Sequence, residues 1–228
     1  MSEGWPASLK LVDGVVLVVS PIAQAQGELL PDEQSLLIGA LLTRQREIIA
    51  GRRMARHAMS QLQMAPAAIM MDGHGAPLWP PGLCGSIAHS PHHIAVCISR
   101  IGHLQSLGID IEDGRELGEA MNGIASQAEI ASVLAAGLAQ DQRVAARMVF
   151  SAKEALFKCQ APVTRNMELD FGEVGLLRDS GGLWGARFLP SGAFSVMASL
   201  QRIRIYFVQL QGVMIALAAM RAAEQISV

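Results

Sequence analysis

The sequence predicts an α+β protein in two halves, and three observations carry that prediction. Short apolar segments that suit strands alternate along the 228 residues with longer amphipathic segments that suit helices. Strands follow one another closely in both halves, which favours antiparallel pairing. Only a short turn at Gly102 and His103 lies between the halves, without a long linker. We therefore expect an N-terminal subdomain of residues 1–104 and a C-terminal subdomain of residues 105–228.

The first half begins with a valine-rich strand at 15–19, because such β-branched runs fit a buried sheet. A long helical stretch follows from 31 to 63, and then strands around 86–88 and 94–99. No apolar run reaches the ~18 residues that a membrane span needs. The valine-rich segment is therefore expected to be a buried strand and not a membrane span.

The second half begins with a strand at 107–112 and continues through helices around 127–136 and 142–159. Residues 202–208 alternate polar and apolar side chains, as a half-exposed strand does. A turn at Gln211 and Gly212 leads to a more buried neighbour at 213–218.

Composition and charge exclude several classes of protein. The net charge of −2 and the sequence pI of about 6.3 give no overall basic field of the kind that a nucleic-acid binder uses. The N-terminus lacks the basic region and cleavage pattern of a secretion signal, so the cytoplasm is the expected compartment. The cysteines have neither an even count nor metal-ligand spacing, and we expect reduced, buried thiols at Cys84, Cys97 and Cys159. A zinc site of His74, His92 and His93 is a weak candidate, since adjacent side chains on an extended chain point to opposite sides.

An acidic pair occupies the strand expected at 107–112. Asp110 and Glu112 alternate with Ile109 and Ile111, so a strand projects both carboxylates from one face while the isoleucines enter a core. In isolation this pattern fits the polar face of an edge strand equally well. It also supplies two hard oxygen ligands of the kind that a divalent cation accepts.

A second cluster follows roughly forty residues later, in 150–158. Glu154 and Lys158 are one helical turn apart, and Lys153 precedes Glu154 directly. Alone, such a pair is most simply a solvated surface pair worth a few tenths of a kcal/mol. Together with the acidic strand, Glu154 completes three carboxylates suited to Mg²⁺, which fills its octahedron with water and substrate phosphates. The lysines would neutralise those phosphates.

These two segments resemble the signature of the 4'-phosphopantetheinyl transferases, which activate acyl and peptidyl carrier proteins. Gly108 to Glu112 is similar to the family's Gly-Ile-Asp-x-Glu strand, and Phe150 to Lys158 to its aromatic-Ser-x-Lys-Glu-(Ala/Ser)-x-x-Lys helix. Upstream, 77–90 is similar to the Pro-x-Trp-Pro...Gly-Ser-Ile-(Ser/Thr)-His segment of the subgroup that contains enterobactin synthase component D. Residues 44–56 are similar to the Arg/Lys-x-x-Glu-Phe-x-x-Gly-Arg helix of the same subgroup.

The resemblance implies two similar α+β subdomains related by pseudo-twofold symmetry, with the active site between them. It also implies transfer of 4'-phosphopantetheine from coenzyme A to a serine of an apo carrier protein, with Mg²⁺ or Mn²⁺ as the metal. Asp110, Glu112 and Glu154 are then the metal ligands. Glu154 is the first choice for the base that takes the serine proton and Glu112 the second, while Lys158 holds the diphosphate. Lys153 either binds the nucleotide phosphates or supports the site.

Three further residues are candidates for binding coenzyme A. Arg44 and Arg52 are eight residues apart, so they lie near the same face of a helix and could both reach one anion. Without the resemblance, a solvated arginine face is the simpler interpretation. With it, we expect binding at Arg52 more than at Arg44. His89 ends an apolar segment, and the family's histidine at this place lies against the coenzyme A diphosphate, although a lone histidine there is more often structural.

Two positions depart from the family pattern. Ala88 stands where a Ser or Thr usually precedes the histidine, and Ala76 where many relatives carry a Lys or Arg that pairs with phosphate. Loss of one such pair costs ~1.5 to 3 kcal/mol unless another base, such as Arg53 or His74, takes its place. Weaker coenzyme A binding is therefore expected.

Glu129 has two interpretations. It resembles an acidic residue that approaches the metal site in relatives, and together with Ser126 it also fits a helix-capping box. The segment 113–133, which includes Met121 and Ile124, is where we expect the carrier protein to dock. Carrier helices are typically acidic, so Arg115 and the basic first helix would steer them.

Three functional hypotheses follow. The leading one is a transferase acting on carrier proteins, and the similarity to the enterobactin subgroup favours secondary metabolism. The second is a relative that binds coenzyme A or a carrier domain without turnover, prompted by Ala76 and Ala88. The third is an unrelated Mg²⁺-dependent phosphohydrolase, in which water replaces the serine as nucleophile. A chain of two halves can build the site alone, so a monomer is expected.

Overall fold

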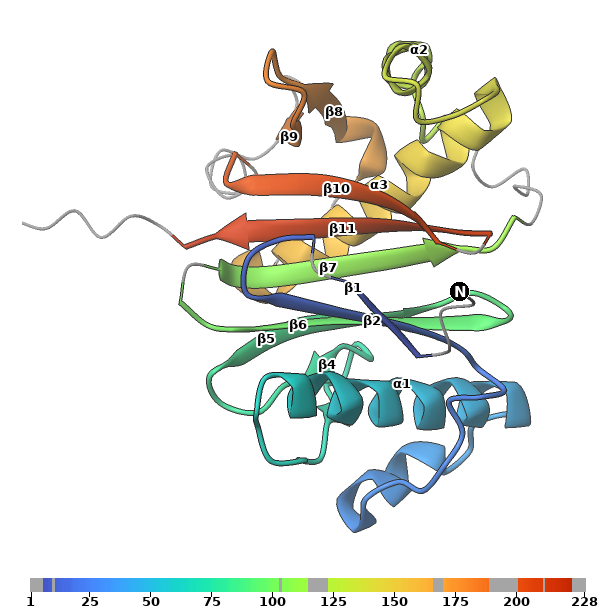
Figure 1. Ribbon diagram of the computed structural model, residues 1–228, viewed down its shortest axis with the longest axis vertical. Coiled ribbons are helices and arrows are strands. Elements are labelled where there is room, and N and C mark those ends of the chain that lie inside the picture. Colours follow the sequence, from blue (N-terminus) through green and yellow to red (C-terminus); the bar gives the residue numbers. More distant parts are fainter. Residues whose placement is uncertain are drawn as a thin grey trace, which may run out of the picture. The chain divides into compact units, whose positions relative to one another are not determined.

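The computed structural model describes residues 6–9, 11–102, 104–114, 123–165, 170–188, 201–210 and 212–222. By its internal contacts the chain divides into two compact units, residues 1–101 and 102–228. Each unit combines helices with an antiparallel sheet (Figure 1). The predicted α+β class is therefore confirmed.

The first unit is a four-stranded antiparallel sheet with one long helix packed on it. Helix α1 (Leu42–Gln61) runs along the sheet and contacts its two central strands (Figure 1). A separate two-stranded ribbon pairs β3 (Met70–Met71) with β4 (Pro77–Leu78). In spatial order the sheet strands, followed by the ribbon strands, are β1 (Ala7–Leu9), β2 (Val15–Pro21), β6 (His93–Arg100) and β5 (Leu83–His89), then β3 (Met70–Met71) and β4 (Pro77–Leu78).

The helix predicted from 31 to 63 is two helices, so that prediction was wrong in its extent. A 3₁₀ helix, η1, spans Pro31–Leu37, and α1 starts only at Leu42. Between them Gly39 has φ +74°, a left-handed conformation that breaks a helix and that glycine adopts without a Cβ clash. The break leaves residues 38–41 as a turn at the start of α1.

The second unit is a five-stranded antiparallel sheet covered by two helices. Helix α3 (Gln142–Thr164) packs on β7 (Leu104–Glu112) and β11 (Val213–Arg221), and α2 (Gln127–Ala135) packs on α3. A short 3₁₀ helix, η3 (Phe171–Glu173), leads into the edge strand β8. In spatial order the strands are β7 (Leu104–Glu112), β11 (Val213–Arg221), β10 (Ile203–Leu210), β9 (Trp184–Phe188) and β8 (Val174–Arg178).

Local chemistry fixes the ends of these elements. The Asp141 side chain accepts hydrogen bonds from the amides of Arg143 and Val144, which caps the start of α3. The helix runs one turn beyond the predicted end at 159 and stops where Arg165 has φ +56°. In the predicted β10–β11 hairpin Leu210 pairs with Val213; Gly212 has φ +86°, while Gln211 lies outside the described residues.

Two expectations concern features of the whole chain. Within the described ranges no helix is both long and apolar enough to cross a bilayer. All three cysteines are buried thiols outside any disulfide. The sheets of the two units have four and five strands among the described residues, and a pseudo-twofold relation between the units stays a prediction.

Candidate active site

The acidic pair lies at the end of β7, as the alternation of carboxylates and isoleucines predicts. Ile109 and Ile111 are buried, and Asp110 is nearly so at 8% exposed. Glu112, the last residue of the strand, is half-buried. Among the strands that the structure describes, β7 lies at the edge of its sheet and pairs with β11 alone.

A glycine brings α3 into direct contact with this strand. A Cβ at Gly108 would collide with the carbonyl oxygen of Ala155 and lie 2.5 Å from the amide nitrogen of Cys159, both in the α3 backbone. Only a residue without a side chain allows the two backbones to approach so closely. The glycine of the Gly-Ile-Asp motif therefore sets the distance between the strand that carries Asp110 and the helix that carries Glu154 and Lys158.

Asp110, Glu154 and Lys158 meet at this contact. The Lys158 ammonium lies 2.7 Å from Asp110 Oδ1 and 3.9 Å from Glu154 Oε2. The Asp110 side chain is 11% exposed, and those of Lys158 and Glu154 are 29% and 28% exposed. The cluster is therefore partly shielded from water, and this shielding strengthens its electrostatic interactions. It is still exposed enough to reach a ligand.

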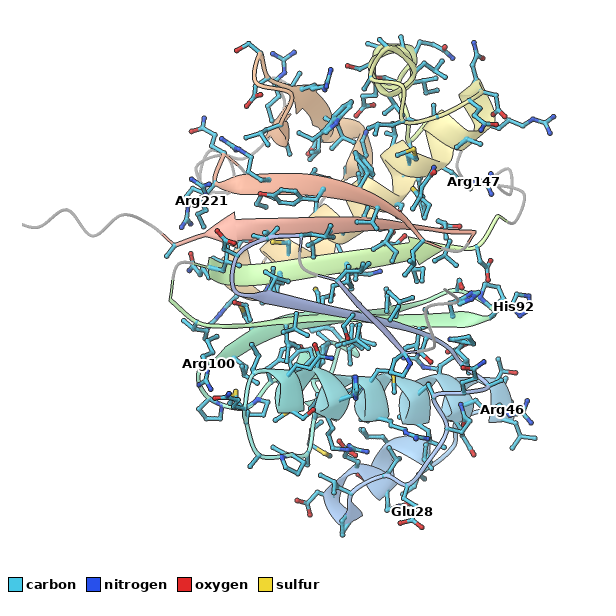
Figure 2. The ribbon with its side chains drawn as sticks, in the orientation of Figure 1. Glu28, Arg46, His92, Arg100, Arg147 and Arg221 are labelled. Atoms are coloured by element: carbon cyan, nitrogen blue, oxygen red, sulfur yellow. The ribbon has the colours of Figure 1, made fainter. Side chains whose placement is uncertain are left out.

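The ionised forms of two carboxylates in the cluster, Glu112 and Glu154, are disfavoured by their surroundings. Burial first, and then the charge of Asp110, raise the pKa of Glu112 to about 7, although Arg147 of α3 (Figure 2) opposes the shift. The pKa of Glu154 is raised by burial above all and also by Asp110, against the effect of Lys158. Such shifts mark a place where an added cation would be stabilised.

No metal site is ready-made in this arrangement. Among the described residues, no group of three or more His, Cys, Asp or Glu side chains is placed to hold a metal ion, the three histidines of the zinc candidate included. The Lys158 ammonium lies within 4 Å of both Asp110 and Glu154 and bridges them instead. A pocket of about 430 Å³ is lined by Glu112 together with Arg147 and Met214.

Lys153 points away from this cluster. Its side chain is 3% exposed, and its ammonium lies 3.0 Å from Glu129 Oε1. It also donates hydrogen bonds to the carbonyl oxygens of Ile124 and Phe171. With three protein partners it has no donor aimed at the cluster, so its position favours the supporting role over nucleotide binding.

Glu129 forms the capping box that the sequence offered as one interpretation. Its amide donates to Ser126 Oγ, while its carboxylate accepts from the Ser126 amide and, at Oε1, from the amide of Leu176. The carboxylate faces Lys153 and not the Asp110 cluster. The buried pair thereby ties α2, α3 and β8 together. Of the predicted docking segment 113–133, residues 115–122, including Arg115 and Met121, lie outside the described residues.

In the first unit, Arg44 and His89 lie next to each other. Arg44 Nη1 is 3.1 Å from His89 Nε2 and 3.0 Å from Glu47 Oε2, and His89 Nε2 is 3.3 Å from the same Glu47 oxygen. The Arg44 and His89 side chains are 46% and 38% exposed. Glu47 belongs to the Arg-x-x-Glu motif, and the spacing of one turn would have predicted its pairing with Arg44. This exposed pair of nitrogen groups could receive an anion.

Arg52 lies inside the unit, separate from Arg44. It is 5% exposed, and its guanidinium donates to the carbonyl oxygens of Ile69 and Met70. Burial lowers its pKa to about 10, with Glu33 acting in the opposite direction. The arrangement reverses our expectation that Arg52 is the better anion ligand of the two.

The two departures from the family pattern lie in different surroundings. Ala88 is buried in β5 at 3% exposed, one residue before His89. Ala76 lies in the exposed turn between β3 and β4, where its amide donates to Asp72 Oδ1. Hydrogen bonds from Ala76 and His74 lower the pKa of Asp72, so this turn presents a carboxylate that stays ionised.

Two family models match the chain. One is described as the 4'-phosphopantetheinyl transferase N-terminal domain and covers residues 32–99. The other is described as the 4'-phosphopantetheinyl transferase superfamily and covers residues 106–205. Their matches contain the Arg44 and His89 pair in the first unit and the Asp110 cluster in the second.

Three curated proteins are similar to the chain. The 4'-phosphopantetheinyl transferase PptT of Mycobacterium tuberculosis is 32% identical over 165 residues, which are 70% of each chain. Svp of Streptomyces mobaraensis, which carries the same enzyme name, is 34% identical over 168 residues, or 72% of this chain and 67% of Svp. Npt of Nocardia iowensis, also so named, is 32% identical over 137 residues, or 59% of this chain and 60% of Npt. With both units matched in order, the chain belongs to the 4'-phosphopantetheinyl transferase superfamily and is an enzyme of that family.

Proposed function

We propose that this enzyme transfers 4'-phosphopantetheine from coenzyme A to a serine of an apo acyl or peptidyl carrier protein. The serine Oγ forms a bond to the β-phosphorus, and the bond from that phosphorus to the bridging diphosphate oxygen breaks. Adenosine 3',5'-bisphosphate leaves, and the serine proton passes to a base of the enzyme. The observation that carries the proposal is the cluster of Asp110, Glu112, Glu154 and Lys158 at the β7–α3 contact.

The donor set suits Mg²⁺, which prefers oxygen ligands and keeps water or substrate phosphate in its remaining positions. We assign Asp110, Glu112 and Glu154 to hold it, with Mn²⁺ as a substitute. When bound, the metal supplies neutralisation of charge on the diphosphate. The raised pKa values of Glu112 and Glu154 support this assignment, because burial above all, and the charge of Asp110 in addition, disfavour the ionised carboxylates and a bound cation would stabilise them.

Lys158 is proposed to exchange partners when substrate arrives. In the structure its ammonium pairs with Asp110 at 2.7 Å. A diphosphate oxygen is an equally suitable partner, and the move would release Asp110 for the metal. Catalysis then consists mainly of alignment and charge stabilisation, as in other phosphoryl-group transfers.

Glu154 is proposed to take the serine proton, directly or through a water, with Glu112 as the second candidate. Burial raises the pKa of Glu154, which moves a carboxylate toward the range of an effective base. A carboxylate that also holds a metal is a weak base, so its position must supply much of the effect.

The first unit is proposed to bind coenzyme A through Arg44 and His89, whose exposed nitrogen groups suit a phosphate. Arg52 is proposed to support this region through its carbonyl partners. We further propose that the enzyme works as a monomer in the cytoplasm and serves secondary metabolism, the last because its motifs resemble those of the enterobactin subgroup.

The test is intact-protein mass spectrometry of an apo carrier protein incubated with the enzyme, coenzyme A and Mg²⁺, with an EDTA control. We expect a metal-dependent gain of one phosphopantetheinyl group. Asp110→Ala and Glu154→Ala should abolish the gain and Lys158→Ala should reduce it strongly, whereas Arg143→Ala, on an exposed part of the same helix, should not. Coenzyme A binding without any modified carrier would favour the non-catalytic relative, and free phosphopantetheine without a labelled carrier would favour a hydrolase.

A further inference from the structure

Three large aliphatic side chains stand in solvent where η1 gives way to α1. Ile38 is 83% exposed, Leu41 81% and Leu42 73%. Every other exposed large hydrophobic residue of the described chain is at most 57% exposed. Single exposed leucines are ordinary on a protein surface, but three within five residues form a patch that usually marks an interaction site.

The backbone beneath this patch is held in place. The Gln45 side chain donates to the carbonyl oxygens of Ala40 and Leu37, at 2.8 and 3.4 Å. The amide of Ala40 donates to Leu37, and the amide of Gln45 to Leu41. Because the turn meets its own hydrogen-bonding needs, the three side chains are presented outward in a defined arrangement. A preorganised surface loses less conformational entropy on binding than a flexible one.

Positive charge borders the patch. Arg44 and Arg46 follow Leu42 within the first two turns of α1, and both are exposed. Figure 2 shows Arg46 at this end of α1. Glu47 forms an ion pair with Arg44. Glu33 of η1 is fully buried and forms an ion pair with Arg56. The exposed surface is thus apolar with a basic edge, which complements an amphipathic helix that is acidic at its margins.

We propose that Ile38, Leu41 and Leu42, with Arg46 at their edge, form a docking surface for an acidic helix of the carrier protein. The inference rests on the proposed function, in which the acceptor is a protein that must be held while its serine reacts. Leu41 and Leu42 lie within one helical turn of Arg44, which is proposed to bind coenzyme A. The patch therefore places acceptor recognition beside donor recognition on the same helix.

Two other occupants fit the patch less well. A membrane surface with anionic lipids is typically bound by clusters of four to eight basic residues, whereas two arginines border this patch and the chain carries a net charge of −2. A stable dimer buries about 800 Å² per partner, more than three side chains provide. Weak, reversible contact with a protein substrate needs no more than a small patch.

The decisive variant is Leu41→Asp/Leu42→Asp. Leu41 is the N-cap of α1 and Leu42 its first residue, positions where Asp favours helix formation, so the fold should be retained. The change removes apolar surface and adds charge that repels an acidic helix. We expect the KM for the carrier protein to rise about tenfold or more, corresponding to ~1.4 kcal/mol per tenfold. The rate at saturating carrier and coenzyme A should be unchanged, and the KM for coenzyme A should rise by less than the KM for the carrier, since the new charges lie near Arg44 but do not replace it. Leu183→Asp, at an exposed leucine of the second unit, is the matched control and should leave all three values unchanged.

Charge is tested separately with Arg46→Glu, which should raise the KM for the carrier and weaken its salt dependence. An apo carrier with one acidic helix residue changed to Lys should bind this variant better than the wild-type carrier does. The wild-type enzyme is assayed first, because absence of transfer there would refute the proposed function and not the docking surface. If the wild type is active, an unchanged carrier KM in the double variant overturns the inference. The inference is also overturned if the double variant loses binding to phosphatidylglycerol vesicles, or loses a dimer detected by light scattering, while its KM for the carrier is unchanged.

Discussion

Among the cations first singled out as site candidates, α1 and α3 each carry one that is buried and one that is more exposed, and the contrast separates support from chemistry. On α1, Arg52 is 5% exposed, whereas the Arg44 side chain is 46% exposed. On α3, the Lys153 side chain is 3% exposed and that of Lys158 29%. The buried cations have fixed protein partners, and the exposed cations lie beside carboxylates that they can leave. A motif identifies all four, but only burial and partners tell which can meet a substrate.

The two helices differ in how closely they approach their sheets. A Cβ at Gly51 of α1 would lie 3.1 Å from Cγ2 of Ile87, the end of a side chain that can move. A Cβ at Gly108 would instead meet the α3 backbone itself, at the amide of Cys159 and the carbonyl of Ala155. The α3 contact therefore tolerates no displacement, and it is the one that forms the carboxylate cluster.

The largest expected effect on stability belongs to Lys153→Met, which leaves Glu129 buried without its cation. Removal of one partner of a buried ion pair costs about 3–5 kcal/mol in the free energy of unfolding. Urea unfolding followed by circular dichroism measures it. Lys158→Met is the matched control on the same helix and should cost well below that amount, because its partners are partly solvated. Equal losses in both variants would remove the distinction between the two lysines.

A double variant that removes both charges of the buried pair tests the same distinction between Lys153 and Lys158. Glu129→Gln combined with Lys153→Met removes both charges and keeps a side-chain oxygen that accepts from the Leu176 amide. Removal of both members of a buried pair costs less than removal of one. We expect the double variant to recover most of the stability lost in the single one and to retain transfer activity. A stable but inactive double variant would instead assign Lys153 to the chemistry.

Gly108→Ala is expected to come next, at about 3 kcal/mol, the upper end of the usual cost of overpacking. The added methyl group must push α3 from β7, which would also lengthen the 2.7 Å contact between Lys158 and Asp110. Transfer activity of the folded protein should therefore fall with the stability. Gly51→Ala should change stability by no more than about 1 kcal/mol, since Ile87 can yield and Ala favours a helix. A loss at Gly51 as large as at Gly108 would contradict the difference between the two contacts.

Arg52→Met should cost about 1.5–3 kcal/mol, the range for hydrogen bonds of a charged group. The carbonyl oxygens of Ile69 and Met70 lose their donor, so the loss appears in urea unfolding. The concentration of coenzyme A needed for half-maximal transfer should stay near the wild-type value. A large rise in that concentration with unchanged stability would instead indicate that Arg52 binds coenzyme A.

Sequence patterns predicted the fold where the burial of side chains is one-sided. The alternation in β7 and β10 gave their strands, and the spacing of Glu154 and Lys158 placed both on one side of α3. The break between η1 and α1 was missed because the apolar pattern continues through Gly39, whose φ of +74° depends on the turn. Periodicity reports which face is apolar, not where the backbone leaves the helix.

The partners of the cations could not be predicted, because they come from other elements. Lys153 and Lys158 are five positions apart, so a helix turns them to different sides. Nothing in the local sequence shows that Glu129 and Phe171 lie on the side of Lys153. Arg44 and Arg52 share a face in projection yet lie about 12 Å apart along the helix axis. Arg44 therefore contacts His89 at the end of β5, whereas Arg52 contacts Met70 in β3.

Arg44→Ala is expected to have the smallest effect on stability and a clear effect on substrate. Its side chain is 46% exposed and pairs with Glu47, and exposed ion pairs contribute about 0–1 kcal/mol. The free energy of unfolding should thus change little, while the KM for coenzyme A rises about tenfold, the value of one charge-assisted hydrogen bond. Competition by adenosine 3',5'-bisphosphate should weaken in parallel, since the contact proposed for Arg44 is to a phosphate and this product carries two. If Arg44→Ala leaves the KM unchanged and Arg52→Met raises it, the assignment of exposed cations to substrate fails on α1, and burial alone cannot separate support from chemistry there.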